Sequence, residues 1–187
     1  MKRRLPVSVC FLLLFLAAGC KTVPQTKSLI SLNGMIYDTD NRPVANYGIL
    51  IDGIPECASD IGGRFEIKNI VKGEHIITGR GNGYLDIKEK VVIKDKAQII
   101  YIRVPSVETT LKEAFSLIKQ GMYEPAESSI QDILSSDSDN HEALFFMCAI
   151  KYLEQDTEGY QSYLKKLKRQ KEGRNYVTEL EKIIAGN

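Results

Sequence analysis

Three side chains in the first half of the chain are of the types that cooperate in thiol chemistry. Cys57 could serve as a nucleophile, His75 as its base and Glu74 as the group that orients the histidine. A reactive thiolate needs an exposed cysteine beside a cation, so the fold decides whether the three can act together. The fold also decides whether Cys57 and Cys148 form a disulfide, because the two Cα atoms must lie within about 7 Å of each other.

Metal and phosphate sites are weakly indicated. A zinc site needs three or four ligands in one shell, whereas the chain has two histidines and His141-Glu142 lacks the second histidine of an HExxH motif. The glycine-rich segment 79–83 is followed neither by a helical pattern nor by the Lys-Ser/Thr pair of a phosphate-binding loop. We therefore expect no metal or cofactor, structural roles for His75 and His141, and a turn at 79–83.

Oxygen-bearing side chains gather at Asp38, Asp40 and Asn41, and oxygen is the ligand that Ca²⁺ prefers. A calcium loop of the EF type would need a further oxygen ligand at position 42, which is Arg42, and a glutamate at position 49, which is Ile49. We predict a capped turn here instead of a cation site.

The first twenty residues have the three parts of a secretory signal peptide. Residues 2–4 are basic, residues 7–18 are almost wholly apolar, and small residues precede Cys20. The apolar run is too short for a good membrane-spanning helix. The segment resembles the lipobox of bacterial lipoproteins, in which the cysteine is diacylated and becomes the new N-terminus. Ala17 stands where that motif usually has leucine, and the alternative is an ordinary signal peptide that is cleaved nearby.

The lipoprotein resemblance implies a signal peptide over 1–19, then a lipidated cysteine and a tether over 20–28. Buried acyl methylenes contribute about 0.8 kcal/mol each, so two chains hold a protein on a bilayer durably. Cleavage removes three basic residues from a chain of formal charge +1 and leaves a mildly acidic body, so we expect no nucleic-acid partner. The eight polar residues 21–28 span at most about 28 Å. In enteric bacteria, an aspartate directly after the lipidated cysteine retains a lipoprotein at the inner membrane. The residue after Cys20 is Lys21, so by analogy we expect the outer membrane.

Residues 29–106 have the pattern of short β-strands. β-branched runs alternate with Gly, Asn, Asp and Pro turn signals, and apolar residues alternate with polar ones. The strands that we expect are Leu29–Tyr37, Tyr47–Asp52, Arg64–Ile70, His75–Gly79, Asp86–Ile93 and Gln98–Val104. Short strands at regular spacing predict a sandwich of two sheets, each with one buried face.

The motifs of this half are Gly34–Asp38, Arg42–Val44, Ile49–Ile51, Ser59–Ile67, Asn69–Ile77 and Gly83-Tyr84. Their order resembles that of the carboxypeptidase regulatory-like domain, a transthyretin-like seven-stranded sandwich. The departures are His75, where an aromatic residue is common, and Cys57, which comes just before the usual Thr-Asp. The family is generally non-catalytic, and the resemblance places Cys57 at the start of one strand and His75 within another. We therefore expect structural roles for both, with free thiols at Cys57 and Cys148.

Residues 107–187 change to the period of an α-helix. The apolar stripes are Leu111/Ala114/Phe115/Ile118, Ala126/Ile130/Ile133/Leu134, Ala143/Phe146/Met147/Ile150/Leu153, Tyr160/Tyr163/Leu164/Leu167 and Tyr176/Leu180/Ile183/Ile184. Thr110-x-x-Glu113 has the form of a capping box for the first helix, and Pro125 fits the first turn of the second. Residues 136–140 predict a polar loop that supplies an N-cap. Each helix has one apolar stripe, so the helices must pack against each other.

The pattern Gln120-Gly121-x-Tyr123-x-x-Ala126 resembles a tetratricopeptide repeat, with Ala114 at the small-residue position of the preceding helix. Cys148 follows Ala114 by the 34 residues that this repeat requires. The second unit is degenerate: Ser138, Gln155 and Tyr160 replace the usual proline, glycine and alanine, respectively. The last helix would be a cap, and an unrelated helical bundle is the alternative.

One concentrated group of cations occurs in the helical half. We call it the basic cluster, and its members are Lys165, Lys166, Lys168, Arg169, Lys171 and Arg174. A run of charges is usually a solvated helix face. The functional alternative is a surface that binds anionic lipid headgroups or an acidic partner.

The sequence therefore predicts a multidomain α+β protein. A transthyretin-like β-sandwich over 29–106 is followed by tetratricopeptide-like helical hairpins over 107–187. We expect a non-enzymatic envelope lipoprotein, acylated at Cys20, that binds the bilayer and a protein or peptide partner. The alternative is a lipoprotein whose sandwich binds a glycan or small molecule; it requires two neighbouring exposed tyrosine rings among Tyr37, Tyr47, Tyr84 and Tyr101.

Overall fold

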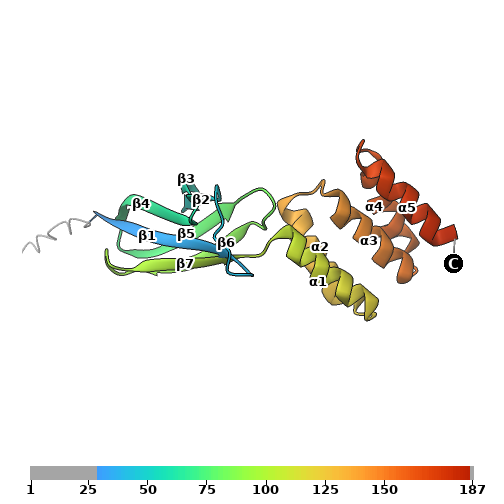
Figure 1. The fold of residues 1–187 in the computed structure, drawn as a ribbon, viewed down its shortest axis with the longest axis horizontal. Coiled ribbons are helices and arrows are strands. Elements are labelled where there is room, and N and C mark those ends of the chain that lie inside the picture. Colours follow the sequence, from blue (N-terminus) through green and yellow to red (C-terminus); the bar gives the residue numbers. More distant parts are fainter. Residues whose placement is uncertain (1–28, 186–187) are drawn as a thin grey trace, which may run out of the picture.

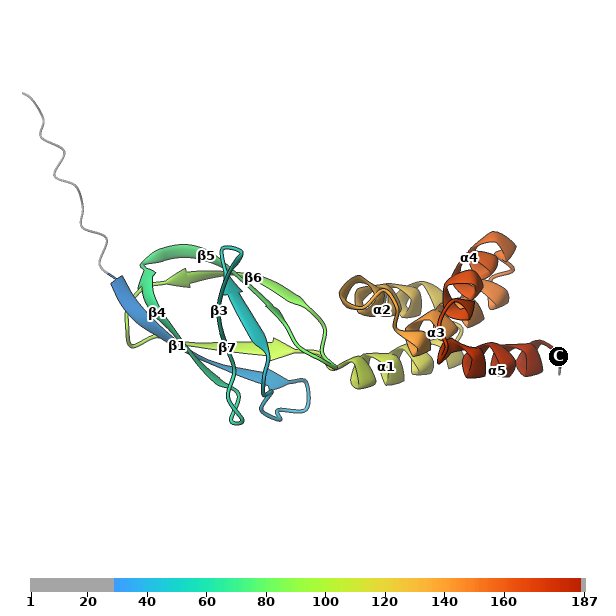
Figure 2. The same cartoon turned by 90° about the horizontal axis from the view of Figure 1, so that it is seen from above.

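A computed structural model describes residues 29–185 of the chain. Residues 1–28 and 186–187 lie outside the described residues, and with them Cys20 and the whole expected signal peptide. Within the described range strands come first and helices follow, which confirms the predicted fold class (Figure 1). The two parts lie end to end, and β1 (Leu29–Asp38) begins at the end of the molecule away from the helices (Figures 1 and 2).

The strands form two sheets that share one apolar core. The remaining strands are β2 (Gly48–Ile51), β3 (Ile54–Ala58), β4 (Arg64–Val71), β5 (Gly73–Arg80), β6 (Ile87–Ile93) and β7 (Ile99–Val104). One sheet has the order β4-β1-β7, in which β1 is antiparallel to β4 and parallel to β7. The other has the order β3-β2-β5-β6 and is antiparallel throughout. The core side chains include Leu32, Ile36, Ile77 and Ile102, because alternate residues of each strand face the other sheet.

All six expected strands are present, and the structure adds β3. It pairs with β2 across the two-residue turn Asp52-Gly53, where φ is 51° and 83°. Positive φ at both turn positions is the geometry of a tight hairpin whose twist matches that of its strands. β3 lies at the edge of its sheet, a position that tolerates Pro55 because an edge strand leaves one row of backbone groups unpaired.

The helices are α1 (Val107–Lys119), α2 (Tyr123–Ser136), α3 (His141–Leu153), α4 (Thr157–Lys168) and α5 (Gly173–Ala185). α1 packs against α2, α3 against α4, and α5 against both helices of the second hairpin. The expected capping box is wrong: α1 begins one turn earlier, because the Ser106 side chain accepts a hydrogen bond from the Thr109 amide and Thr110 lies inside the helix. The loop over 136–140 supplies the N-cap of α3 as predicted: the capping residue is Asn140, whose side chain accepts a hydrogen bond from the Ala143 amide at 3.0 Å.

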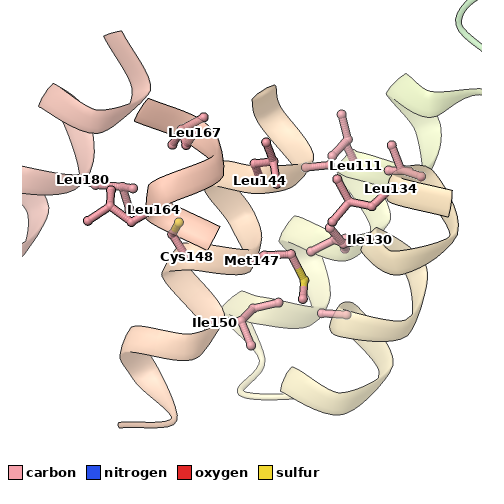
Figure 3. Close-up of a cluster of buried hydrophobic side chains, with 14 of the residues drawn as sticks. Leu111, Ile130, Leu134, Leu144, Met147, Cys148, Ile150, Leu164, Leu167 and Leu180 are labelled. Atoms are coloured by element: carbon pink, nitrogen blue, oxygen red, sulfur yellow. The ribbon is translucent and has the colours of Figure 1, made fainter. Parts of the chain in front are cut away.

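The helical core is built from the predicted stripes, and Figure 3 shows it at close range. Ala114, Ala126 and Cys148 are fully buried where two helices approach closely. Cys148 and Cys57 are both free thiols. In the part of the chain that the structure describes, no helix combines the length and the apolar character needed to cross a bilayer.

The two halves are joined by more than the chain between β7 and α1. Leu85, from the loop between β5 and β6, belongs to the apolar core of the helices and is 8% exposed. The Leu85 amide donates to the carbonyl of Pro105 at 3.0 Å, and the Val107 amide donates to the carbonyl of Gly83 at 2.9 Å. The Asp86 amide donates to the Ser136 hydroxyl at 3.0 Å. The loop therefore holds the first helical hairpin in a defined position on the end of the sandwich.

Candidate interaction surfaces

A continuous line of rings crosses three helices on one side of the helical half. We call it the aromatic row; its members are Phe115 of α1, Phe146, Phe145 and His141 of α3, and Tyr176 of α5. Successive ring centroids are 6.0 Å apart from Phe115 to Phe146, 5.6 Å from Phe146 to Phe145 and 5.6 Å from Phe145 to Tyr176. His141 stacks on Tyr176 at 6.3 Å. These separations are those of favourable aromatic pairs, so the rings support one another.

The aromatic row is partly open to solvent. Phe115 is 48% exposed, and the other four rings are half-buried. The row lies on α1, α3 and α5 because each of these helices turns part of its apolar stripe away from the core. The row was missed from the sequence, where Phe115, Phe146 and Tyr176 are assigned to the buried stripes.

Opposite charges mark the two ends of the aromatic row. The Lys119 ammonium lies 5.0 Å from the centroid of the Phe115 ring, a cation–π arrangement. At the other end His141 Nε2 lies 3.4 Å from a carboxylate oxygen of Glu172. A row of rings with a cation at one end and a carboxylate at the other can bind an apolar segment in one direction.

A second exposed apolar surface lies between α3 and α5. A hollow of about 70 Å³ is lined by Ala149, Tyr152, Leu153, Leu180, Ile183 and Ile184. Leu153 and Ile183 are each 46% exposed, although the sequence assigns both to buried stripes. Exposed apolar side chains that cluster are a feature of protein-binding surfaces, whereas scattered ones are ordinary.

All six members of the basic cluster are exposed, on the outer helix α4 and around the start of α5. Lys165, Lys168 and Arg169 share one side of α4, where with Gln161 and Leu164 they line a shallow hollow of about 470 Å³. The Lys166 ammonium lies 5.2 Å from the centroid of the Tyr163 ring.

Two tyrosines lie side by side on the open face of the sheet β4-β1-β7. Tyr101 is 65% exposed and Tyr37 is half-buried, and both line a hollow of about 480 Å³ with Asn41 and Arg103. The Arg103 guanidinium donates to the Asn41 side-chain oxygen at 2.7 Å, which fixes the rim of this hollow.

Tyr47, proposed from the sequence as an exposed platform, is fully buried. Burial raises the pKa of its hydroxyl well above the ordinary value for tyrosine, with a smaller contribution from Asp86. Its ring contacts the edge of Tyr84, with centroids 6.4 Å apart. Tyr47 therefore belongs to the core.

The structure does not bring Cys57, His75 and Glu74 together as a nucleophile, a base and an orienting group. Both nitrogens of His75 are engaged elsewhere: Nδ1 lies 2.7 Å from a carboxylate oxygen of Asp52, and Nε2 lies 2.9 Å from the carbonyl oxygen of Val71. Burial, with a smaller contribution from Glu56, raises the pKa of the Cys57 thiol, which disfavours the thiolate. His75 ties the β2–β3 turn to β5, which is the structural role expected.

The expected turn at Asp38 forms around a buried carboxylate. Asp38 accepts hydrogen bonds from the amides of Asp40 and Arg42 and from the Arg42 guanidinium, at 2.8–2.9 Å. Asn41 has a φ of 61°, as a turn residue can. Among residues 29–185, no three His, Cys, Asp or Glu side chains are placed to hold a metal ion.

A polar hollow of about 950 Å³ lies at the junction of the two halves. Its lining comes from the Gly-rich loop between β5 and β6, from residues 45–48 and from the α2–α3 loop. The predicted turn is confined to residues 81–83, because β5 extends through Gly79 to Arg80, and residues 80–83 form one wall of this hollow between the halves.

In the comparison with known proteins, a family model matches the helical half of the chain. The model of the family described as "Coatomer epsilon subunit" matches residues 103–185. No curated protein matches the chain.

Solved structures similar to the chain are matched over less than half of its length. One is a mutant type II cohesin–X-dockerin complex from Acetivibrio cellulolyticus, with 19% identity, a TM-score of 0.34, and coverage of 40% of this chain and 56% of that chain. Another is BcpA, the major pilin subunit of Bacillus cereus, with 14% identity, a TM-score of 0.34, and coverage of 42% of this chain and 28% of that chain. The chain thus spans about half, or less, of the solved chains that it matches. The relationship established here is that residues 103–185 match the coatomer epsilon family model.

Proposed function

We propose that this chain is a lipid-anchored, non-catalytic protein-interaction module of the bacterial cell envelope. Cys20 is diacylated, a sandwich of the carboxypeptidase regulatory-like type serves as a spacer, and the helices bind a protein partner. The observation that carries this proposal is the aromatic row, which spans three helices and leaves ring surface open to solvent.

Aromatic rings suit this role for physical reasons. They bury a large apolar area on binding, and residues of this kind are concentrated at the centres of protein interfaces. The rings of the aromatic row contact one another from α1 to α5, so little side-chain freedom is lost when a partner covers them. The family model that matches the helices is named for a subunit, which agrees with a helical half that assembles with another protein.

The sandwich is suited to hold the helices away from a bilayer. β1 begins at the end of the molecule opposite the helices (Figure 1), and the tether before it spans at most about 28 Å. The contacts of Leu85 hold the helices against the end of the sandwich. In this arrangement the aromatic row faces solvent beyond the membrane surface.

Photocrosslinking in the producing cells tests the partner-binding face. A benzophenone amino acid is placed at Phe115 or at Phe146, and a control is placed at Ile61, which is 91% exposed on the sandwich. We expect a light-dependent adduct of the same mass from both aromatic-row positions and none of that mass from position 61. The absence of an adduct, or the same adduct from all three positions, contradicts the proposal.

The anchor is tested by two cysteine variants. Cys20→Ala is expected to release the chain from the membrane fraction in a high-salt wash, because the acyl chains are lost. Cys10→Ala, inside the expected signal peptide, is the matched control and is expected to leave the chain in the membrane fraction. Equal retention of the two variants contradicts acylation at Cys20.

A second candidate function rests on Tyr37 and Tyr101. An exposed ring with polar groups at the rim can stack on the apolar face of a sugar, and Tyr101 is such a ring, with Asn41 and Arg103 lining the same hollow. Tyr37 is half-buried beside it, so this site relies mainly on Tyr101. Co-sedimentation of the chain with purified cell-wall glycan tests it. Tyr101→Ala should abolish sedimentation while Tyr84→Ala, on another face, should not; identical behaviour of the two variants would exclude this site.

A further inference from the structure

The basic cluster carries more positive charge than its surroundings neutralise. Its six side chains are exposed, and among residues 29–185 no carboxylate lies within the 4.0 Å of an ion pair with any of them. The nearest acidic residue in sequence, Glu172, contacts His141 instead. By contrast, Lys151 contacts Glu127 and Glu154 at 2.7 and 3.1 Å.

Helix stability accounts for only part of the cluster. Cations in the last turn of α4, such as Lys165 and Lys168, complement the negative end of its dipole. Lys165 and Arg169, however, are four residues apart, a spacing at which like charges disfavour a helix. Arg174 lies in the first turn of α5, whose N-terminal end favours negative charge and which has no acidic residue in that turn. Positive charge is thus present at the start of α5, where the helix dipole favours negative charge.

The shape of the surface favours an extended segment over a flat bilayer. Lys165, Lys168 and Arg169 surround a hollow whose wall is formed by Leu164 and Gln161. Leu164 and Leu167 of α4 are buried in the helical core, so the helix has no free apolar face to insert among lipids. The helices also lie at the end of the molecule opposite the start of β1 (Figure 2), away from the proposed anchor.

We propose that the basic cluster binds an acidic segment of the protein partner, rich in Asp or Glu, that lies along the outer side of α4. This inference rests on the proposed function and adds the chemistry of the partner. The aromatic row lies on α1, α3 and α5, whereas this surface lies mainly on α4, so one partner contacts the helices at two separate places. Opposite charge at such a surface speeds association and selects among partners.

The test uses the unacylated mature chain, residues 20–187 with Cys20→Ala, which holds every described element. The probe is a fluorescently labelled peptide of ten glutamates, and its anisotropy reports binding at low salt. The variant Lys165→Glu/Arg169→Glu is compared with the control Lys94→Glu/Lys96→Glu, which makes the same change of net charge on exposed residues of the sandwich. Circular dichroism checks that both variants are folded.

We expect the α4 double variant to weaken peptide binding about tenfold, and the sandwich control to weaken it less than about twofold. Equal weakening by the two variants would overturn the proposal, because net charge alone would then explain binding. Tighter binding to vesicles of phosphatidylcholine with anionic phosphatidylglycerol, lost in the α4 variant, would assign the surface to lipid and also overturn it. Failure of this proposal leaves the crosslinks at Phe115 and Phe146 intact, whereas failure of the proposed function removes them.

Discussion

The hydroxyl oxygen of Tyr47 lies 2.7 Å from the carbonyl oxygen of Leu85, the residue that the sandwich contributes to the helical core. The same hydroxyl lies 3.0 Å from the carbonyl oxygen of Gly79, so its single proton is shared between two acceptors on either side of the Gly-rich loop. A fully buried side chain of the sandwich thus holds the loop that reaches the helices. We therefore expect this contact to contribute to the coupling of the two halves.

Tyr47→Phe tests the coupling. Removal of the hydroxyl leaves two buried carbonyl groups with one donor fewer, which we expect to cost about 1–3 kcal/mol of unfolding free energy. Urea denaturation followed by circular dichroism measures the loss. Tyr84→Phe is the matched control. Tyr84 packs against the ring of Tyr47, and its hydroxyl forms no hydrogen bond with any other residue that the structure describes. A loss of the same size in both variants would contradict a special role for Tyr47.

Leu85→Ala should uncouple the halves more strongly. Leu85 is 8% exposed in the helical core, and truncation of a buried leucine costs about 2–5 kcal/mol through lost burial and a residual cavity. We expect the thermal transition of the chain to separate into two, one for each half. Leu153→Ala, at a 46% exposed position, should leave the transition unchanged. A single shifted transition in Leu85→Ala would show that the loop does not couple the halves.

The carboxylates of Asp38 and Asp52 should make the unfolding free energy depend on pH. Burial acts to raise the pKa of Asp38, but hydrogen bonds from Arg42 and Asp40 outweigh it and hold the pKa below its usual value. The pKa of Asp52 is lowered by the Ile76 amide and by His75. A carboxylate with a lowered folded-state pKa contributes stability that is complete above its unfolded pKa of about 4 and is lost as pH falls through the folded pKa.

We therefore expect the unfolding free energy of the wild type to fall as the pH drops below about 4. Asp38→Asn should lower the unfolding free energy at pH 7, and it should make the further decrease below about pH 4 less steep. Denaturant titrations between pH 2 and 7 measure both effects. Asp139→Asn, an exposed position in the α2–α3 loop, is the control and should retain the wild-type profile. An unchanged acid profile in Asp38→Asn would contradict the assigned hydrogen bonds.

The two free cysteines of the described range should differ in reactivity. Burial raises the pKa of Cys148 to about 12, and the side chain is fully enclosed by the helices. Cys57 is only half-buried on the edge strand β3. In the Cys20→Ala chain at pH 8, we expect iodoacetamide to modify Cys57 slowly and Cys148 only after unfolding, as mass spectrometry of the peptides would report. Faster modification of Cys148 than of Cys57 would contradict this packing.

Sequence periodicity was sufficient to predict the elements that have one buried face. β4 alternates Phe65 and Ile67 inward with Glu66 outward, and the helical stripes place Ile130 and Met147 in the core. β3 was missed because all five of its residues are at least partly exposed, so burial leaves no alternating pattern, although the Asp-Gly turn before it is a hairpin signal. The start of α1 was misplaced because both Ser106 and Thr110 can cap a helix, and only the fold shows that Ser106 does.

The candidate surfaces were less predictable, because they depend on how the helices pack against one another. A stripe shows which residues are apolar but not how much of the stripe the neighbouring helix covers. Phe115 and Leu153 belong to predicted stripes and nevertheless remain 48% and 46% exposed, because the packing of α1 and α3 covers only part of each stripe. Leu85 has no periodic context, so its place in the helical core follows only from the fold. The basic cluster was visible in sequence because it is contiguous.

The proposed function requires acylation of Cys20, and the mass of the native N-terminal peptide tests this requirement most directly. We predict that the protein purified from membranes begins at Cys20 and that this residue carries the mass of at least a diacylglyceryl group. A native chain that retains residues 1–19, or that carries an unmodified thiol at Cys20 and leaves the membrane in a salt wash, would contradict the proposed anchoring and the function that depends on it.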